Sequence, residues 1–455
     1  MKKHTTTALV AVTLGALGLT AFTGYRVMSA AFGTEAYAAQ SAIVAEQDGE
    51  TVYAAAAEES TAAAETDTAA ETDAAAETDT AAETAAYTAA AGSALSAEEL
   101  FTERDLEQTA DLSEAVYYTV ADGETINITS AGVYVISGTA ANASVIVEAG
   151  DQDKVQLVLD GVSLTNDSTP CIYVKSADKV FVTTTDSENS LSVTGTFTAD
   201  GDTNTDAVIF SKEDLVLNGT GTLKISSSDN GITGKDDLKI TGGTIVISCA
   251  SDAVEANDSV RIADGNVTIV TDKDGIHAEN DEDNTTGFVY IGGGTLNITA
   301  GDDAVHATTI LQIDGGEITL KGAEGLEATW VQVNDGTVSI DASDDGVNAA
   351  AKSKTMTPAA EFNGGTVTIV MGAGDTDAVD SNGNLRITGG TLDITAQSPF
   401  DCDGTVEKTG GTLIVNGQET DTVTNQMMGG MGGMNGMGGM NGMGGMGGMG
   451  GPRGH

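Results

Sequence analysis

The chain has 455 residues, with 68 acidic and 19 basic side chains, and its formal net charge at pH 7 is -49. This charge makes nucleic acid an implausible partner, because phosphate binding needs clustered Lys and Arg, and it disfavours anionic membrane surfaces. Only 4% of the residues are aromatic, so a core must be built from Val, Ile, Leu and Ala. The three cysteines, Cys171, Cys249 and Cys402, are too few for a disulfide framework and are expected to be small buried side chains.

The N-terminus has the pattern of a secretory signal. Lys2 and Lys3 precede an apolar run over residues 8–22, and residues 36–38 (Ala-Tyr-Ala) form a candidate cleavage site. We therefore assign residues 1–38 to a signal peptide. An uncleaved anchor is the alternative, although the run is short for a span of ~20 residues. The expected location is extracellular, either secreted or associated with the cell surface.

Two segments of biased composition flank the rest of the chain. Residues 39–95 are Ala, Glu, Thr and Asp in near-repeats without a hydrophobic face, which is typical of a disordered, self-repelling spacer. Residues 426–455 are rich in Gly and Met and predict a disordered tail, with Cu(I) binding by thioethers as an alternative. Between them, Ser96 and Glu99 have capping-box spacing ahead of Leu100, which predicts a short helix or a lid over an exposed end of the fold.

The segment from residue 96 to residue 425 has the pattern of a repeat protein. Strand-like runs begin near Thr119, and between Leu215 and Asn416 one phrase recurs about nine times. Each phrase has a short apolar strand, a glycine pair, a second alternating strand and an acidic step of the form Asp-(Ala/Gly)-(Val/Ile)-x-Ala, as in residues 238–257 and 289–307. A period of roughly 20–30 residues indicates a solenoid, because no single unit can bury its own apolar face.

The repeat predicts an all-β, right-handed parallel β-helix of roughly 10–13 coils. No helical period separates the strands, and the units are too short for propeller blades. The glycine pairs, such as residues 242–243 and 364–365, are expected at one corner, where a tight turn needs positive φ. The longer inserts at 279–287 and 350–360 are expected on the binding face.

Stacking would align the acidic steps in two columns. The leading residues are Asp206, Asn230, Asp252, Asp274, Asp303, Glu324, Asp345 and Asp377. Three residues further on come Glu255, His277, His306, Glu327, Asn348 and Asp380. The apolar residue between the two positions of each step is expected to point inward.

Carboxylates stacked every ~4.8 Å repel one another, so such a column must reach solvent, take up protons or share cations. Ca²⁺ suits carboxylates from neighbouring coils. The candidate calcium ligands are Asp252, Glu255, Asp274, Glu279, Asp302, Asp303, Asp345, Asp377 and Asp380. A merely solvated column is the alternative. His277 and His306, on adjacent coils, could instead bind Zn²⁺ or form a stack made cationic by its neighbours.

Several long phrases resemble a known family. They include VQLVLDGVSLTN, IYVKSADKVFVTTTDSENSLSVTGTF and DAVEANDSVRIADG, within roughly residues 110–417. The chain resembles the bacterial extracellular carbohydrate-binding right-handed β-helix proteins, which are related in fold to polysaccharide lyase family 9. The resemblance implies calcium binding and the binding of cellulose or polygalacturonate. It extends the calcium-ligand interpretation only to Asp252, Glu255, Asp274, Asp303 and similar matched positions.

The expected function is calcium-dependent, non-catalytic binding of plant cell-wall or other acidic polysaccharide by a monomer, with no inferable protein partner. Scarce aromatic residues favour an acidic polysaccharide over crystalline cellulose, because aromatic platforms normally stack on sugar rings. One alternative is a pectate-lyase-like enzyme with Lys273 as its base, although the neighbouring Asp272 and Asp274 would raise the pKa of Lys273 in the wrong direction. The other alternative is a structural adhesin.

Overall fold

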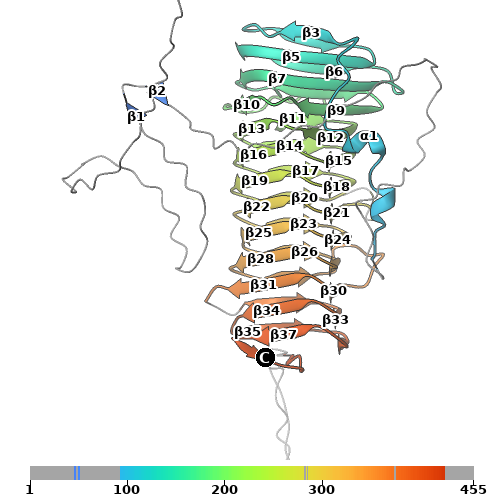
Figure 1. Ribbon diagram of the computed structural model, residues 1–455, viewed down its shortest axis with the longest axis vertical. Helices are drawn as coiled ribbons and strands as arrows, with labels where there is room; N and C mark the ends of the chain where they lie inside the picture. The colour runs from blue at the N-terminus through green and yellow to red at the C-terminus, as the bar shows by residue number, and fades with distance from the viewer. Residues whose placement is uncertain are drawn as a thin grey trace, which may run out of the picture. The chain divides into compact units, whose positions relative to one another are not determined.

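The computed structural model describes residues 93–280, 283, 285–373 and 376–425, and the backbone of two short pieces nearer the N-terminus (Figure 1). These pieces are the strands β1 (Glu46–Gln47) and β2 (Glu50–Thr51), which pair antiparallel. The signal peptide, nearly all of the spacer and the Gly/Met tail lie outside the described residues and remain predictions. Within the described part of the chain, no helix is long and apolar enough to cross a membrane.

Residues 116–419 form almost only β-strands, in two large sheets that we call the narrow sheet and the long sheet. The narrow sheet has twelve parallel strands. In stacking order they are β4 (Thr125–Ile128), β6 (Ser144–Glu148), β8 (Ile172–Ser176), β11 (Ala207–Ser211), β14 (Asn230–Gly234), β17 (Val254–Ala256), β20 (Ile276–Ala278), β23 (Val305–Ala307), β26 (Leu326–Ala328), β29 (Val347–Ala349), β32 (Asp377–Ser381) and β35 (Ser398–Cys402).

The long sheet contains two series of strands. After β3 (Val116–Thr119), β5 (Gly132–Ala141) and β7 (Lys154–Asn166), one series is β9 (Lys179–Thr184), β12 (Asp214–Gly219), β15 (Asp237–Ile240), β18 (Ser259–Ile262), β21 (Phe288–Ile291), β24 (Ile310–Ile313), β27 (Trp330–Val333), β30 (Ala359–Phe362), β33 (Asn384–Ile387) and β36 (Val406–Lys408). The other is β10 (Glu188–Val193), β13 (Thr222–Ser227), β16 (Thr244–Cys249), β19 (Asn266–Thr271), β22 (Thr295–Thr299), β25 (Glu317–Gly322), β28 (Thr337–Ala342), β31 (Thr366–Met371), β34 (Thr391–Thr395) and β37 (Thr412–Val415), which ends in an antiparallel pairing with β38 (Gln418–Glu419).

Through the regular repeat, each coil contributes one strand to each series, and each strand pairs in parallel with the strand three elements later. This arrangement confirms the predicted parallel β-solenoid. The core is a set of aliphatic ladders inside the coils. Val254, Ile276, Val305 and Leu326 align in register and are fully buried, so the apolar residue of each acidic step points inward as expected. The three cysteines are buried free thiols, also as expected.

The glycine pairs lie at the turn before one series of the long sheet. The second glycine of each pair has positive φ, for example 80° at Gly243 and 67° at Gly365. In most pairs the first glycine lies against the preceding coil, since a Cβ on Gly364 would clash with the carbonyl oxygen of Asn334, whereas one on Gly242 would meet the side chain of Gln108. The predicted corner is therefore confirmed, and each glycine of the pair has its own steric reason.

Residues 93–108, which we call the strap, lie on the outside of the solenoid, over the β9–β36 series (Figure 1). The strap contains the 3-10 helix η1 (Ala97–Glu99) and the helix α1 (Glu103–Leu106). It runs against the stacking direction, because the Leu95 amide donates to Gln312 Oε1 (2.7 Å) whereas Glu107 O accepts from Asn218 Nδ2 (2.9 Å) on a much earlier coil.

The sequence pattern predicted the capping box at η1, whereas it lies at the next element, α1. The predicted lid covers a different surface from the one expected. Ser96 makes no side-chain cap bond, whereas Thr102 and Asp105 form a reciprocal box at α1. Phe101 and Leu100 pack with Ala263 and buried Tyr290, so the strap covers the side of the stack. The outer surface of the long sheet therefore supplies the apolar contacts that hold this segment.

Asp105 attaches the strap through a buried triad of charges. Its side chain is fully buried, and its carboxylate lies 3.3 Å from Lys179 Nζ and 2.7 Å from Lys239 Nζ. Burial raises the pKa of Asp105, but the two ammonium groups outweigh burial and hold the pKa below its usual value.

Replacing Asp105 with Ala should leave Lys179 and Lys239 buried without this carboxylate, at a cost of about 3–5 kcal/mol. We expect the strap to detach, with faster hydrogen exchange over residues 93–108 and a lower melting temperature. Asp111→Ala, a nearby fully exposed site, is the control. Equal exchange in the two variants would contradict the assigned role of Asp105.

Candidate functional site

The outer face of the narrow sheet carries one unbroken column of polar side chains, which we call the outward column. Each short strand has two inward apolar residues and one outward residue between them, as in β20, where Ile276 and Ala278 are buried and His277 is not. The register aligns Glu255, His277, His306, Glu327, Asn348, Asp380 and Asp401. The second predicted column is therefore continuous in the structure.

The leading acids of the steps form a second column in the turns before these strands. In several of these acids, one carboxylate oxygen accepts the backbone N–H of the equivalent residue on the next coil. Asp252 Oδ1 accepts from Asp274 N (3.1 Å) and Asp274 Oδ1 accepts from Asp303 N (3.0 Å). Asn230 makes the same bond to Asp252 N (2.9 Å) through its amide oxygen. These acids therefore have a structural role that an amide can also perform.

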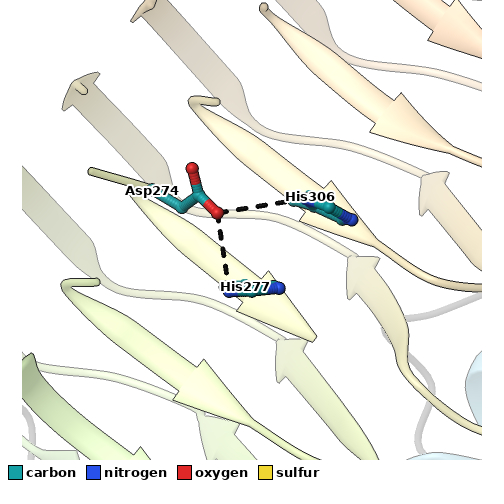
Figure 2. Close-up of side chains that lie close together, drawn as sticks. All are labelled: Asp274, His277 and His306. Atoms are coloured by element: carbon teal, nitrogen blue, oxygen red, sulfur yellow. Dashed lines mark ion pairs between the residues drawn. The ribbon is translucent and has the colours of Figure 1, made fainter. Parts of the chain in front are cut away.

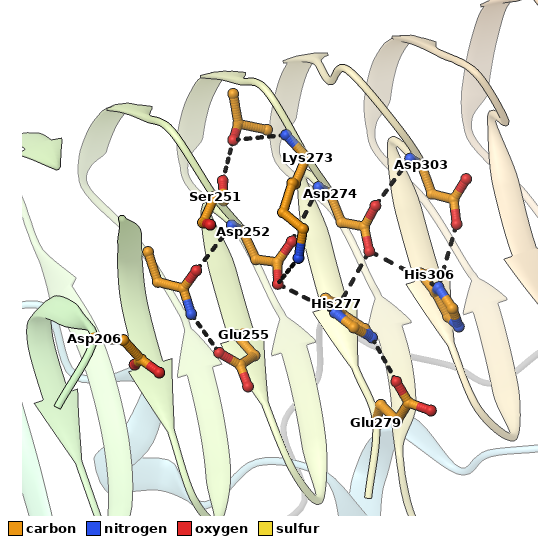
Figure 3. A network of polar contacts seen from close by, with 12 residues as sticks. Asp206, Ser251, Asp252, Glu255, Lys273, Asp274, His277, Glu279, Asp303 and His306 are labelled. Atoms are coloured by element: carbon orange, nitrogen blue, oxygen red, sulfur yellow. Dashed lines mark hydrogen bonds and ion pairs between the residues drawn. The ribbon is translucent and has the colours of Figure 1, made fainter. Parts of the chain in front are cut away.

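The second carboxylate oxygens of these acids point at the imidazoles of the outward column (Figures 2 and 3). His277 Nδ1 lies 3.4 Å from Asp274 Oδ2 and 3.5 Å from Asp252 Oδ2, and its Nε2 lies 3.2 Å from Glu279 Oε2. The rings of His277 and His306 stack with centroids 4.7 Å apart. Each imidazole is therefore placed among carboxylates by the spacing of the coils.

His306 has its own set of acidic neighbours. Its Nδ1 lies 3.2 Å from Asp303 Oδ2, 3.3 Å from Glu327 Oε2 and 3.9 Å from Asp274 Oδ2. Lys352 Nζ approaches the same Glu327 carboxylate at 2.8 Å. The centre of the column is thus compensated by internal cations.

The pKa values of the two stacked histidines are shifted in opposite directions. Burial lowers the pKa of His277, but Asp252, Asp274 and Glu279 outweigh it and raise the pKa to about 9. Burial and the charge of His277 lower the pKa of His306. Burial raises the pKa of Asp274 to about 6. Within the stacked pair, protonation is therefore favoured on His277 over His306.

Further acids of the two columns have raised pKa values. Burial and the neighbouring Glu327 and Asp303 raise the pKa of Glu324 to about 8. Burial, Asp380 and other acids raise the pKa of Asp345 to about 7. Among the described residues, neither Asp345 nor Asp380 has an ion-pair partner. These two acids therefore lack the cations that neutralise Glu255 and Glu327.

A polar pocket of about 680 Å³ opens at the N-terminal end of the outward column. Its lining includes Lys235, Glu255, His277 and Glu279, and the insert after β20 supplies Asn280 and Asp283. Lys235 Nζ lies 3.3 Å from Glu255 Oε1. The longer insert therefore borders this pocket, and its expected place on a binding face stays a prediction.

The predicted site residues fall into two groups. Asp274, Asp302 and Asp303 offer oxygen atoms within 4.8 Å of one another, and so do the donors of Asp274, His277 and His306 and those of Asp303, His306 and Glu327. In the part of the chain that the structure describes, no such three-donor group includes the other candidates, Asp252, Glu255, Glu279, Asp345, Asp377 and Asp380.

Sequence reasoning missed the lysines that compensate the column. Lys352 lies in the insert over 350–360 and Lys235 lies just after β14. The length of that insert was the sequence feature from which a contact between Lys352 and the column could have been expected. The local sequence gave no signal for Lys235, because its partner Glu255 is one coil away.

The fold and the column define a class: a parallel β-solenoid with a polar, mainly acidic outer face on its narrow sheet. The chain belongs to a family of carbohydrate-binding domain-containing proteins, whose model matches residues 122–378. A relative from Acetivibrio thermocellus with the same description is 36% identical over 122 residues, which are 26% of this chain and 43% of the relative. The chain thus spans less than half of that relative.

A solved structure described as a polysaccharide lyase-like protein from C. thermocellum, in a gadolinium derivative, is also similar. It is 25% identical, covers 64% of this chain and 98% of its own, and has a TM-score of 0.40.

The raised pKa of His277 predicts a pH dependence of stability. Since its folded pKa of about 9 exceeds the ordinary value of 6.5, the stabilisation is complete below about pH 6.5 and is lost as pH rises through about 9. Thermal melts in a chelator should therefore decline over this interval.

His277→Gln should remove this decline, whereas His306→Gln should keep it, because the pKa of His306 is lowered. Identical pH profiles for the wild type and His277→Gln would show that the imidazolium does not stabilise the column.

Proposed function

We propose that this protein is a secreted or cell-surface, non-catalytic binder of acidic polysaccharide, and that the glycan lies along the outward column with calcium as a bridge. The proposal includes the right-handed winding of the coils and the export of the chain by its N-terminal signal. A monomer suffices, because one stack presents the whole column. The net charge of -49 argues against nucleic acid as a partner.

The observation that carries the proposal is the polar pocket on the family-matched segment. Its lining offers the carboxylates of Glu255 and Glu279, the amides of Asn257 and Asn280 and the ammonium of Lys235. Such groups hydrogen-bond sugar hydroxyls in both directions, as donors and as acceptors. Among the described residues of the lining there is no Trp, Tyr or Phe, which favours polar recognition of a soluble, charged chain over stacking on a crystalline surface.

Calcium dependence rests on the all-oxygen group of Asp274, Asp302 and Asp303. Ca²⁺ takes 6–8 oxygen ligands, and carboxylates from two adjacent coils suit it. Asp302 is exposed beside its two buried partners, so an ion held there could also reach a carboxylate of the glycan. The ion would supply charge neutralisation between two anionic partners.

A second candidate metal is favoured by the histidines. His306 Nδ1 lies 3.2 Å from Asp303 Oδ2 and 3.3 Å from Glu327 Oε2. Nitrogen and oxygen donors at such separations suit a tetrahedral Zn²⁺ ion. Lys352 argues against Zn²⁺ at this position, because its ammonium already neutralises Glu327. Titration with Zn²⁺ and with Ca²⁺, each after chelation, separates the two cases.

The lyase alternative has weaker support. Lys273, the candidate base, has an exposed side chain, and its ammonium lies 3.8 Å from Asp252 Oδ2. A base must lie within reach of the proton that it removes in a bound substrate, and Lys273 lies outside the lining of the polar pocket. The family description as carbohydrate-binding likewise favours binding over cleavage.

The test is retention on polygalacturonate with calcium and with EGTA. We expect retention only with calcium, and the Asp302→Asn variant should lose affinity at least about tenfold because one of the three oxygen donors becomes a weaker amide ligand. Asp341→Asn, at an exposed site on the long sheet that pairs with Lys321, is the control and should bind as the wild type does.

Retention that is indifferent to EGTA would overturn the calcium part of the proposal. Absence of retention on any acidic glycan in either buffer would overturn the binding part and leave the adhesin alternative. Release of an unsaturated product that absorbs in the ultraviolet would overturn the non-catalytic assignment in favour of the lyase.

A further inference from the structure

The first coils of the solenoid carry a second, chemically different part of the same face. The outward position that holds Glu255 and His277 in later coils holds Ile146, Tyr173 and Phe210 on β6, β8 and β11. The rings of Tyr173 and Phe210 pack edge to face with centroids 5.7 Å apart. The narrow sheet therefore presents an apolar, aromatic section at its N-terminal end and a charged section beyond it.

A loop of residues 194–206 folds over this aromatic section. It connects β10 to β11 and is anchored by backbone bonds, such as Thr198 N to Ser168 O at 2.8 Å. At its tip, Asp200 Oδ2 accepts from Tyr173 OH (3.2 Å) and lies 2.7 Å from Lys175 Nζ. One carboxylate thus meets a phenol and an ammonium on adjacent outward positions of β8.

The loop and the sheet enclose a pocket of about 280 Å³. Its apolar part is formed by Ile146 and Tyr173, its hydroxyls include those of Thr125 and Thr169, and its cation is Lys175. Lys175 Nζ also lies 5.0 Å from the centroid of the Tyr173 ring. An apolar wall, hydroxyls and one cation are together suited to a single sugar ring that carries a carboxylate.

We propose that this pocket is a calcium-independent subsite for one acidic sugar unit, whose carboxylate replaces that of Asp200 on Lys175 and Tyr173. The inference rests on the proposed function, because it assumes that the glycan is acidic. It adds a second contact that uses a lysine and a tyrosine where the outward column would use a metal ion.

The exposure of Asp200 makes this exchange feasible. The Asp200 side chain is 50% exposed and that of Lys175 is 29% exposed, and ion pairs at such exposure contribute little to stability. Asp200 also lies beside Gly201, which has φ of 61° and open space around the position of a Cβ. The Asp200 carboxylate can therefore be exchanged for that of a ligand at little cost in stability.

The aromatic section is continuous with the polar pocket. Lys235, which lines the polar pocket, lies 5.9 Å from the ring centroid of Phe210, and Phe210 packs on Tyr173. From Tyr173 the outward positions run through Phe210, Thr233 and Glu255 to His277, which is four coil steps, or about 19 Å. A short oligosaccharide laid along the stack can reach both pockets.

The test is the binding of digalacturonate in EGTA, measured by calorimetry on the full chain, with lactose as the uncharged comparison. We expect digalacturonate to bind and lactose not to. Asp200→Asn should tighten binding several-fold, because a neutral amide competes less well for Lys175. Lys175→Gln should weaken binding at least about tenfold. Tyr173→Phe keeps the ring and removes the phenol donor, so it should weaken binding less.

Lys224→Gln is the matched control, because Lys224 Nζ forms an ion pair of the same 2.7 Å length with Glu188 on the long sheet. It should bind as the wild type does. Binding that appears only in Asp200→Asn would also support the subsite, as the exchange would then be limited by the native carboxylate.

The subsite is overturned if neither the wild type nor Asp200→Asn binds in EGTA, or if Lys175→Gln binds like the control. Calcium-dependent retention on polygalacturonate can persist in either case. Failure of this inference is thereby distinguished from failure of the proposed function.

Discussion

Parallel, in-register stacking of the coils is the constraint on which the rest of the structure depends. It repeats every outward position at about 4.8 Å, so a residue type that recurs in the sequence becomes a column on the surface. In the core this gives aliphatic ladders such as Val254, Ile276 and Val305. On the narrow sheet the same rule forces carboxylates together. The structure offsets their repulsion with backbone N–H donors, the imidazolium of His277 and the ammonium groups of Lys235 and Lys352.

This compensation is uneven along the stack, and its unevenness shapes the proposed function. The early coils have aromatic outward residues under the 194–206 loop, the middle coils have a compensated cluster around His277 and His306, and the late coils have acids such as Asp345 and Asp380 with raised pKa values. A glycan laid along the outer face of the narrow sheet would thus meet the aromatic section, the polar pocket and the anionic surface in turn. Each of these three regions would bind a different part of an acidic polysaccharide or a bridging cation.

The repeat allowed the fold to be predicted from the sequence. Its period predicted the parallel coils, the glycine corner and the register that aligns Glu255 with His277, because each of these features follows from local pattern alone. The sequence did not reveal that several leading residues accept a backbone N–H from the next coil, since an acid and an amide look different in sequence but act alike at Asn230 and Asp252. It also missed the partners of Asp105 and Asp200, which lie in other coils or across a loop. Contacts between segments of irregular sequence have no period from which they can be inferred.

The central claim is that the outer face of the narrow sheet is the glycan-binding surface. A crystal structure of the protein with calcium and an oligogalacturonate would test it most directly. The account predicts sugar density over the outer face of the narrow sheet, from the aromatic section at Tyr173 to the cluster at His277 and His306. Sugar bound to the long sheet, with the outward column empty, would contradict it.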